Sequence, residues 1–145
     1  MPKPLPEKLF LETFKYVPRL AVSLIIVNSK GQVLLARRAI PPEFGLWHMP
    51  GSFLLKGESI QQCIKRIAMH ELRLKVSPTD AKLQNAFDNL KRDPRGHVVD
   101  LIYKLKTGKL PRTTSETKEV KFFDALPKEI GFNHGETLRK LGYSL

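Results

Sequence analysis

The chain has 145 residues, of which 41% are hydrophobic and 27% charged, and it contains a single cysteine, Cys63. These values are typical of one globular domain, so we expect one domain over residues 1–145 with a leading helical segment at 1–17. Fibrous and disordered classes are excluded. One cysteine excludes an internal disulfide and a multi-cysteine metal site. The longest apolar stretch, residues 20–27, is far shorter than the ~20 residues of a membrane span, so we expect a cytoplasmic protein that does not bind membranes.

The chain is strongly basic. Lysine and arginine number 25 against 14 acidic residues, which gives a net charge of +11. Such an excess favours anionic partners, namely nucleotides, nucleic acid or acidic membrane surfaces. A basic solvated surface without any such partner explains the count equally well.

The first half of the chain predicts short strands and loops followed by one helix. In chain order we expect a helix within residues 4–16, a buried strand beginning at Arg19, a turn at 28–31 that closes a hairpin with a strand at 32–38, a loop at 39–49, a tight turn at Pro50 and Gly51, and a short apolar segment at 53–55. Ser59 is a good N-cap. The main helix follows it, because apolar residues recur at helical spacing from Ile60 to Leu72.

The second half predicts three strands and a small helix. We expect strands at 82–90 and 98–106 around a turn at 92–96, a short strand at 119–123 and a helix at 137–141. Strands on both sides of the main helix indicate an α+β class, with helices packed against a sheet as a sandwich.

Glu71 is the most informative residue of the main helix. At about 100° per residue it projects within about 20° of Ile60 and Ile64, in the middle of the apolar stripe. A buried, unpaired carboxylate costs several kcal/mol, so Glu71 needs a metal ion or an arginine as its partner. The alternative is that the helix ends near His70 and that Glu71 faces water.

Residues 52–74 resemble the Nudix box, whose pattern is G-x5-E-x7-R-E-U-x-E-E-x-G-U with U aliphatic. Glu58, Arg66, Ala68, Glu71 and Leu74 stand at matching or nearly matching positions, and the preceding G-L-W-H-M-P-G at 45–51 is similar to the family's G-x-W-x-x-P-G. The resemblance implies a single Nudix-like domain, an α/β/α sandwich with a mixed sheet. The departures are Ser52, Ile67, His70 and Arg73, and three of them touch the active loop.

The resemblance also implies a divalent metal, Mg²⁺ or Mn²⁺, held against the diphosphate of a substrate. Oxygen ligands suit such ions. We expect these to be Glu71, the Gly51 carbonyl and Glu116, so that Glu71 and Glu116 count as catalytic residues. Glu58 and Arg66, eight residues apart on one helical edge, are expected to form an ion pair that braces the loop.

The reduced box is most similar to that of the GDP-mannose hydrolase branch and related nucleotide-sugar hydrolases. In such a reaction Arg38 would add to the neutralisation of phosphate charge, as a catalytic and substrate-binding residue. The general base stays open among Glu116, Glu119 and His97. The string R-D-P-R-G-H at 92–97 resembles a turn of ADP-ribose hydrolases in the same family, although it also reads as an ordinary strand connection.

Two further side chains are candidate substrate contacts. Arg95 is expected, like Arg38, to bind phosphate or nucleotide instead of forming a structural ion pair. Trp47 could stack on a base or pack in the core.

Two functions from different classes remain open. The first is a metal-dependent hydrolase of a nucleoside diphosphate derivative such as GDP-mannose or ADP-ribose. The second is a catalytically weakened or inactive Nudix-fold module that binds nucleotide or RNA. The resemblance also implies a homodimer as one oligomeric state.

Overall fold

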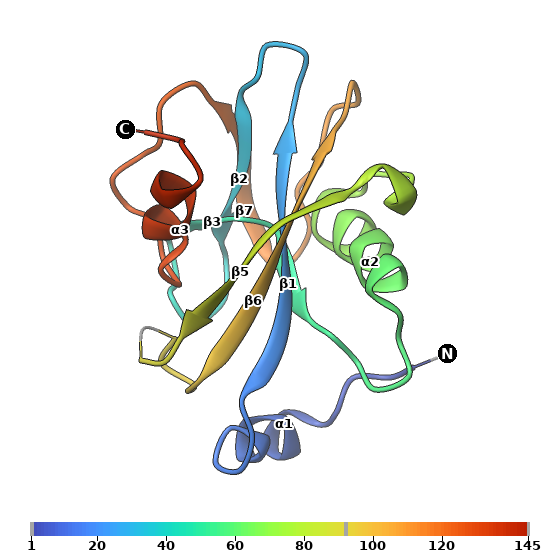
Figure 1. The fold of residues 1–145 in the computed structure, drawn as a ribbon, viewed down its shortest axis with the longest axis vertical. Helices are drawn as coiled ribbons and strands as arrows, with labels where there is room; N and C mark the ends of the chain where they lie inside the picture. The colour runs from blue at the N-terminus through green and yellow to red at the C-terminus, as the bar shows by residue number, and fades with distance from the viewer. Residues whose placement is uncertain (1, 92, 145) are drawn as a thin grey trace.

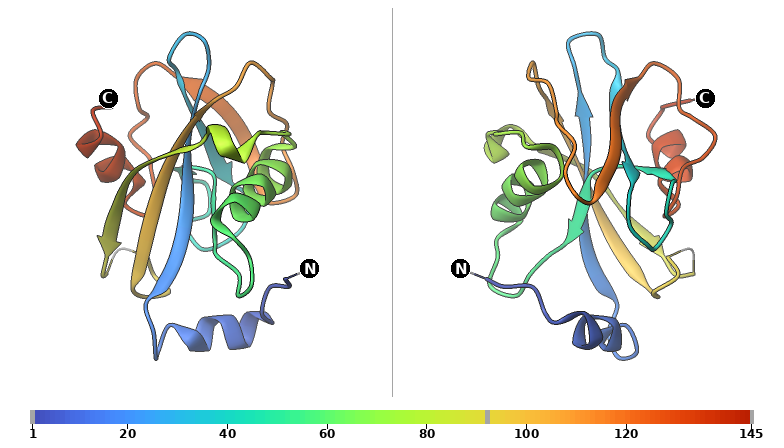
Figure 2. Two further views of the ribbon diagram at one scale, coloured as in Figure 1. Left: turned by 45° about the vertical axis from the view of Figure 1, so that its right-hand side comes forward. Right: turned by 180° about the vertical axis from the view of Figure 1, so that it is seen from behind.

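The computed structural model describes residues 2–91 and 93–144 of the chain. Seven strands form one mixed sheet, with helices α2 and α3 on opposite sides of it and α1 at one end (Figure 1). Two turned views show the same arrangement (Figure 2). No helix in the described part of the chain is long and apolar enough to cross a membrane. The elements are α1 (Glu7–Thr13), β1 (Arg19–Val27), β2 (Val33–Arg38), β3 (Trp47–His48), β4 (Gly51–Phe53), α2 (Ile60–Leu72), the 3-10 turn Pro78–Asp80, β5 (Lys82–Asn89), β6 (Val98–Lys106), β7 (Thr117–Phe123) and α3 (His134–Lys140).

Strand β1 is the centre of the sheet. It pairs in parallel with β6 along its whole length and antiparallel with β4. Strand β2 instead pairs antiparallel with β3 and β7. The predicted hairpin of β1 and β2 is present only at its tip, where Val27 pairs with Val33. The two strands then separate because β4 and β6 take the two edges of β1.

The two faces of β1 pack in two separate hydrophobic cores. Val22, Leu24 and Ile26 pack in the cluster that contains α2. Ile25 and Val27 pack on the other face, in the cluster that contains Leu138 of α3. This alternation is the two-residue period of a strand. Because both faces are covered, the strand is a continuous apolar run, as expected of a buried strand.

Helix α2 begins and ends at well-defined caps. The Ser59 hydroxyl accepts a hydrogen bond from the Gln62 amide at 3.1 Å, and the Gln62 side chain accepts one from the Ser59 amide at 2.8 Å. At the other end Arg73 adopts a left-handed conformation with φ of 52°. The helix continues through Glu71 to Leu72, so the alternative in which it ends near His70 is wrong.

The predicted α+β sandwich is confirmed, and the differences concern short elements. Strand β3 lies inside the segment predicted as a loop, β4 begins in the predicted turn and ends at the first residue of the predicted apolar segment, and α3 begins three residues earlier than expected. A strand of two or three residues carries no periodic pattern of its own. Its existence depends on the neighbouring strand, which sequence spacing does not reveal.

Candidate active site

A cavity of about 890 Å³ opens between the sheet, α2 and the N-terminal segment. Its volume is in the range of small-molecule sites. Its walls bring together six residues singled out from the sequence: Arg38, Gly51, Arg66, Glu71, Arg95 and Glu116.

Glu71 reaches this cavity from the last turn of α2. The Gly51 amide donates to Glu71 Oε1 at 3.4 Å, across the gap between β4 and the helix. The pKa of Glu71 is raised to about 8, chiefly by burial and in part by Glu116, whereas the hydrogen bond from the Gly51 amide and the charge of Arg38 act in the opposite direction. The surrounding positive charge therefore does not fully compensate this carboxylate.

Gly51 is packed too closely for any side chain. A Cβ at this position would lie 2.9 Å from both Ser23 Oγ and the Val22 carbonyl oxygen. In strand backbone the N–H and C=O of one residue point to the same side. Since the Gly51 N–H points to Glu71, its carbonyl is presented to that side too.

Arg66 joins α2 to the segment that precedes it. Its Nε and Nη2 donate to the two carboxylate oxygens of Glu58 at 2.8 and 3.0 Å, and its Nη1 donates to Ser52 Oγ at 2.9 Å. Nη2 also donates to the Phe53 carbonyl at 3.0 Å. The hydrogen bond from Arg66 lowers the pKa of Glu58. Ser52, which stands where the box pattern has glycine, thus adds an acceptor to this ion pair.

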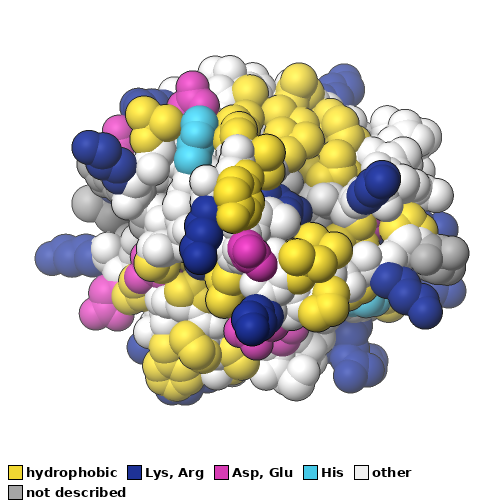
Figure 3. Space-filling view, turned by 90° about the horizontal axis from the view of Figure 1, so that it is seen from below, with side chains coloured by type: hydrophobic (Ala, Val, Ile, Leu, Met, Phe, Trp, Pro, Cys, Tyr) yellow, Lys and Arg dark blue, Asp and Glu magenta, His cyan; other side chains and the backbone are white. Residues whose placement is uncertain are grey.

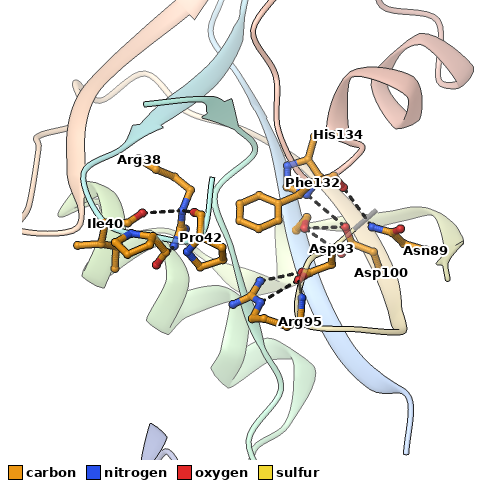
Figure 4. A network of polar contacts seen from close by, with 11 residues as sticks. Arg38, Ile40, Pro42, Asn89, Asp93, Arg95, Asp100, Phe132 and His134 are labelled. Atoms are coloured by element: carbon orange, nitrogen blue, oxygen red, sulfur yellow. Dashed lines mark hydrogen bonds and ion pairs between the residues drawn. The ribbon is translucent and has the colours of Figure 1, made fainter. Parts of the chain in front are cut away.

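Arg38 ends β2 and is held by the loop that follows it. Its Nε donates to the carbonyls of Ile40 and Pro42, and its Nη2 donates to that of Pro41 (Figure 4). Its guanidinium lies 5.0 Å from the centre of the Phe132 ring. Burial, and then the nearby Arg95, lower its pKa. Nη1 has no hydrogen-bond partner among the described residues, so it is available to a ligand oxygen.

Arg95 corrects one expectation. It forms a two-point ion pair with Asp93, with Nε–Oδ1 at 2.9 Å and Nη2–Oδ2 at 2.8 Å, so the prediction that it makes no structural ion pair is wrong. The Asp93 side chain is almost fully buried, and its carboxylate would be left without a cation if Arg95 turned away. Arg95 nevertheless lines the cavity, 5.4 Å from the ring of Phe132. Arg92, at the start of the same string, lies outside the described residues.

Other candidates are not brought to the cavity. Trp47 is buried in the core against Phe123, with ring centres 4.9 Å apart, so the structure places it in packing and not beside a base. Of the three candidate bases, Glu116 lines the cavity, whereas Glu119 and His97 do not.

A buried polar network in the wall of the cavity was not expected from the sequence. Ser23 Oγ donates to the Asp100 carboxylate, with distances of 2.8 and 3.0 Å. His134 Nε2 lies 3.6 Å from the same carboxylate, and its Nδ1 accepts a hydrogen bond from the Met49 amide at 2.9 Å. The network thereby ties the residues before Gly51 to β1, β6 and α3. The available signal was a polar residue flanked by apolar ones in each of two strands, Ser23 in β1 and Asp100 in β6.

His48 lies beside this network as a neutral imidazole. Burial and the neighbouring His134 lower its pKa to about 3. Its Nδ1 is 2.6 Å from the Met49 carbonyl oxygen, so the proton resides on Nδ1 and is donated to that carbonyl.

Comparison with known proteins decides the family. Residues 17–141 match the model of the NUDIX domain. This chain belongs to the Nudix family. It is 32% identical over 118 residues to the ADP-ribose pyrophosphatase of Methanocaldococcus jannaschii. The match covers 79% of this chain and 68% of that protein.

Solved structures of other Nudix proteins share the fold. A MutT/nudix family protein from Enterococcus faecalis superposes with a TM-score of 0.77 and 23% identity, over 94% of this chain and 68% of its own. The NUDIX domain of Shewanella oneidensis NrtR, solved in complex with ADP ribose, gives a TM-score of 0.73 and 23% identity, over 94% and 96% of the two chains. At this level of identity the likeness concerns the fold.

The Nudix box of this chain lacks two glutamates, and the structure shows where their replacements lie. Ile67 is buried in the core cluster of α2. His70 is exposed and does not line the cavity. Glu71 is therefore the only carboxylate that α2 contributes to the cavity, among the residues described.

Proposed function

We propose that this Nudix hydrolase cleaves the diphosphate of ADP-ribose or a closely similar nucleoside diphosphate derivative. The observation that carries the proposal is the meeting, in one cavity, of the carboxylates of Glu71 and Glu116 with the guanidinium groups of Arg38 and Arg95. Guanidinium groups match phosphate oxygens. Carboxylate oxygens in the same cavity are ligands that a divalent cation would take.

A divalent ion, Mg²⁺ or Mn²⁺, fits this donor set together with a substrate. The residues that would hold it are Glu71, Glu116 and the Gly51 carbonyl. The described residues include no group of three His, Cys, Asp or Glu side chains able to hold a metal alone. Oxygens of the diphosphate would complete the ligand set, and the bound ion would neutralise charge on the leaving group.

The choice of ADP-ribose over GDP-mannose rests on two supports. The relative from Methanocaldococcus jannaschii bears the name ADP-ribose pyrophosphatase. Arg95, from the string similar to ADP-ribose hydrolases, lines the cavity. The reduced box supports nucleotide sugars such as GDP-mannose as the second substrate class.

The test is turnover of ADP-ribose and GDP-mannose with Mg²⁺ or Mn²⁺ by the wild type, Glu71→Gln and His70→Gln. Glu71→Gln keeps the side-chain volume but removes a negative oxygen ligand, so kcat/KM should fall by at least a hundredfold, about 2.7 kcal/mol. His70→Gln changes the adjacent exposed residue and should stay within twofold. Binding without turnover in the wild type would favour the catalytically inactive module instead. Equal activity of Glu71→Gln and the wild type would refute the role of Glu71.

A further inference from the structure

The N-terminal segment forms one wall of the cavity. Six of its residues line it: Lys3, Pro4, Leu5, Glu7, Phe10 and Leu11. The match to the NUDIX domain begins only at residue 17, so this wall lies outside the part of the chain that matches the family. On the face viewed from the α1 end, hydrophobic side chains gather in groups with basic and acidic ones between them (Figure 3).

Three phenylalanine rings hold the wall against the site. Phe10, Phe14 and Phe53 contact one another edge to face, with ring centres 5.1–5.7 Å apart. Phe53 is in β4, two residues after Gly51. Edge-to-face ring pairs stabilise by more than the apolar area that they bury, so this cluster holds α1 against β4.

The guanidinium groups of Arg19 and Arg95 pack against this cluster. Arg19 donates to Thr13 Oγ1 at 2.6 Å, and its guanidinium lies 5.3 Å from the Phe10 ring and 5.8 Å from the Phe53 ring. On the other side, Arg95 lies 5.0 Å from the same Phe53 ring. The wall is thus linked to Arg95, which lines the same cavity.

The chemistry of the wall suits a flat heterocycle. Leu5 and Leu11 line the cavity with aliphatic side chains that are 42% and 43% exposed. Leu54 and Leu55 add apolar surface to the same cavity, and Lys3 adds a positive charge. Leucine offers no hydrogen bond to sugar hydroxyls, whereas the face of a purine gains from burial against apolar side chains.

We infer that residues 3–11 form the subsite for the base of the nucleotide, and that the sugar on the far side of the diphosphate binds elsewhere in the cavity. The inference rests on the proposed function. It assigns base recognition to a segment outside the Nudix match. Affinity for the base-bearing half of the substrate should therefore depend on Leu5 and Leu11.

The test uses the two halves of ADP-ribose, AMP and ribose 5-phosphate, each of which carries a phosphate but only the first a base. Dissociation constants are measured by calorimetry with Mg²⁺ for the wild type, the double variant Leu5→Asn with Leu11→Asn, and Leu9→Asn. Leu9 is in α1 with Leu11, is 47% exposed and does not line the cavity, so Leu9→Asn is a matched control. All three substitutions are neutral and at exposed positions, and circular dichroism checks that the helix persists.

The double variant should bind AMP at least fivefold more weakly than Leu9→Asn. This is the loss of affinity expected when about 40 Å² of apolar contact with the base is removed. Its affinity for ribose 5-phosphate should change less than twofold. An unchanged AMP affinity, equal weakening of both ligands, or weakening of ribose 5-phosphate alone would each overturn the inference, as would a wild type that does not bind AMP. Turnover of ADP-ribose by the wild type is measured separately, so failure of the proposed activity is distinguishable from failure of the base subsite.

Discussion

Gly51 shows how the site depends on the absence of a side chain. A methyl group there would meet Ser23 Oγ and the Val22 carbonyl at 2.9 Å, so β4 would have to move away from β1. We expect Gly51→Ala to lower the free energy of unfolding by about 1–3 kcal/mol. Gly108→Ala is the control, because a Cβ there has no heavy atom within 4 Å. It should change stability by less than about 0.5 kcal/mol in urea denaturation. Similar losses in the two variants would contradict the close packing.

The raised pKa of Glu71 predicts that the stability of the metal-free protein depends on pH. Its pKa of about 8 lies above the ordinary value of 4.5, so between these values the folded protein keeps a proton that the unfolded chain has lost. The contribution of Glu71 to stability is complete below about pH 4.5 and is lost as the pH rises through about 8.

The direction of this pH dependence is measurable as a difference in stability between variants. In a chelator, the free energy of unfolding of the wild type minus that of Glu71→Gln should decrease from pH 5 to pH 8.5. Added Mg²⁺ should oppose the decrease, because the ion binds the ionised carboxylate. Glu119→Gln, at an exposed position of β7, should run parallel to the wild type. A difference that does not vary with pH would show that Glu71 is not protonated in the folded state.

At the scale of the element, α2 was predictable because it carries both a cap and a long period. Ser59 and the apolar spacing determine where it begins and which face is buried, and the observed capping box agrees. Strands β3 and β4 were not predictable, because two or three residues carry no period and their pairing partners are distant in sequence.

The end of α2 contains strain that a glycine would remove. Arg73 has φ of 52°, a left-handed conformation that is unfavourable for a residue with a Cβ, and it stands where the Nudix box has glycine. We expect Arg73→Gly to raise the free energy of unfolding by about 0.5–1 kcal/mol, measured as a higher denaturation midpoint at unchanged slope. Arg73→Lys keeps the Cβ and should leave stability unchanged. If Arg73→Lys stabilised the protein as much as Arg73→Gly, the left-handed backbone at this position would not be the cause.

At the scale of the whole molecule, Asp100 joins segments that are distant in the chain. Its carboxylate accepts from Ser23 of β1 and faces His134 of α3, which in turn holds the Met49 amide. Asp100→Ala would leave buried donors without an acceptor, at a cost of about 2–4 kcal/mol in unfolding free energy. Asp88→Ala removes a carboxylate that is 74% exposed on β5 and should cost less than about 0.5 kcal/mol. If both variants lose the same free energy of unfolding, the buried network contributes no more to stability than an exposed carboxylate does.

The sequence by itself determined the main strand β1, helix α2 and the spacing that places Glu58, Arg66 and Glu71 along one segment. These are local properties, because apolar periodicity and capping act between residues a few positions apart. The ion pair of Glu58 with Arg66 was predicted too, although the structure places Glu58 just before α2 and not on the helix, so that Arg66 reaches back to it.

Only the tertiary structure decided which distant residues meet. The separation of β1 from β2, the burial of Trp47, the ion pair of Arg95 with Asp93 and the buried network of Asp100 all depend on contacts between segments distant in the chain. The same holds for the N-terminal wall: apolar spacing predicted a short helix within residues 4–16, but not that Leu5 and Leu11 line the cavity. Which residues become buried or paired depends on the surface that distant segments of the chain present. Local sequence spacing does not specify that surface.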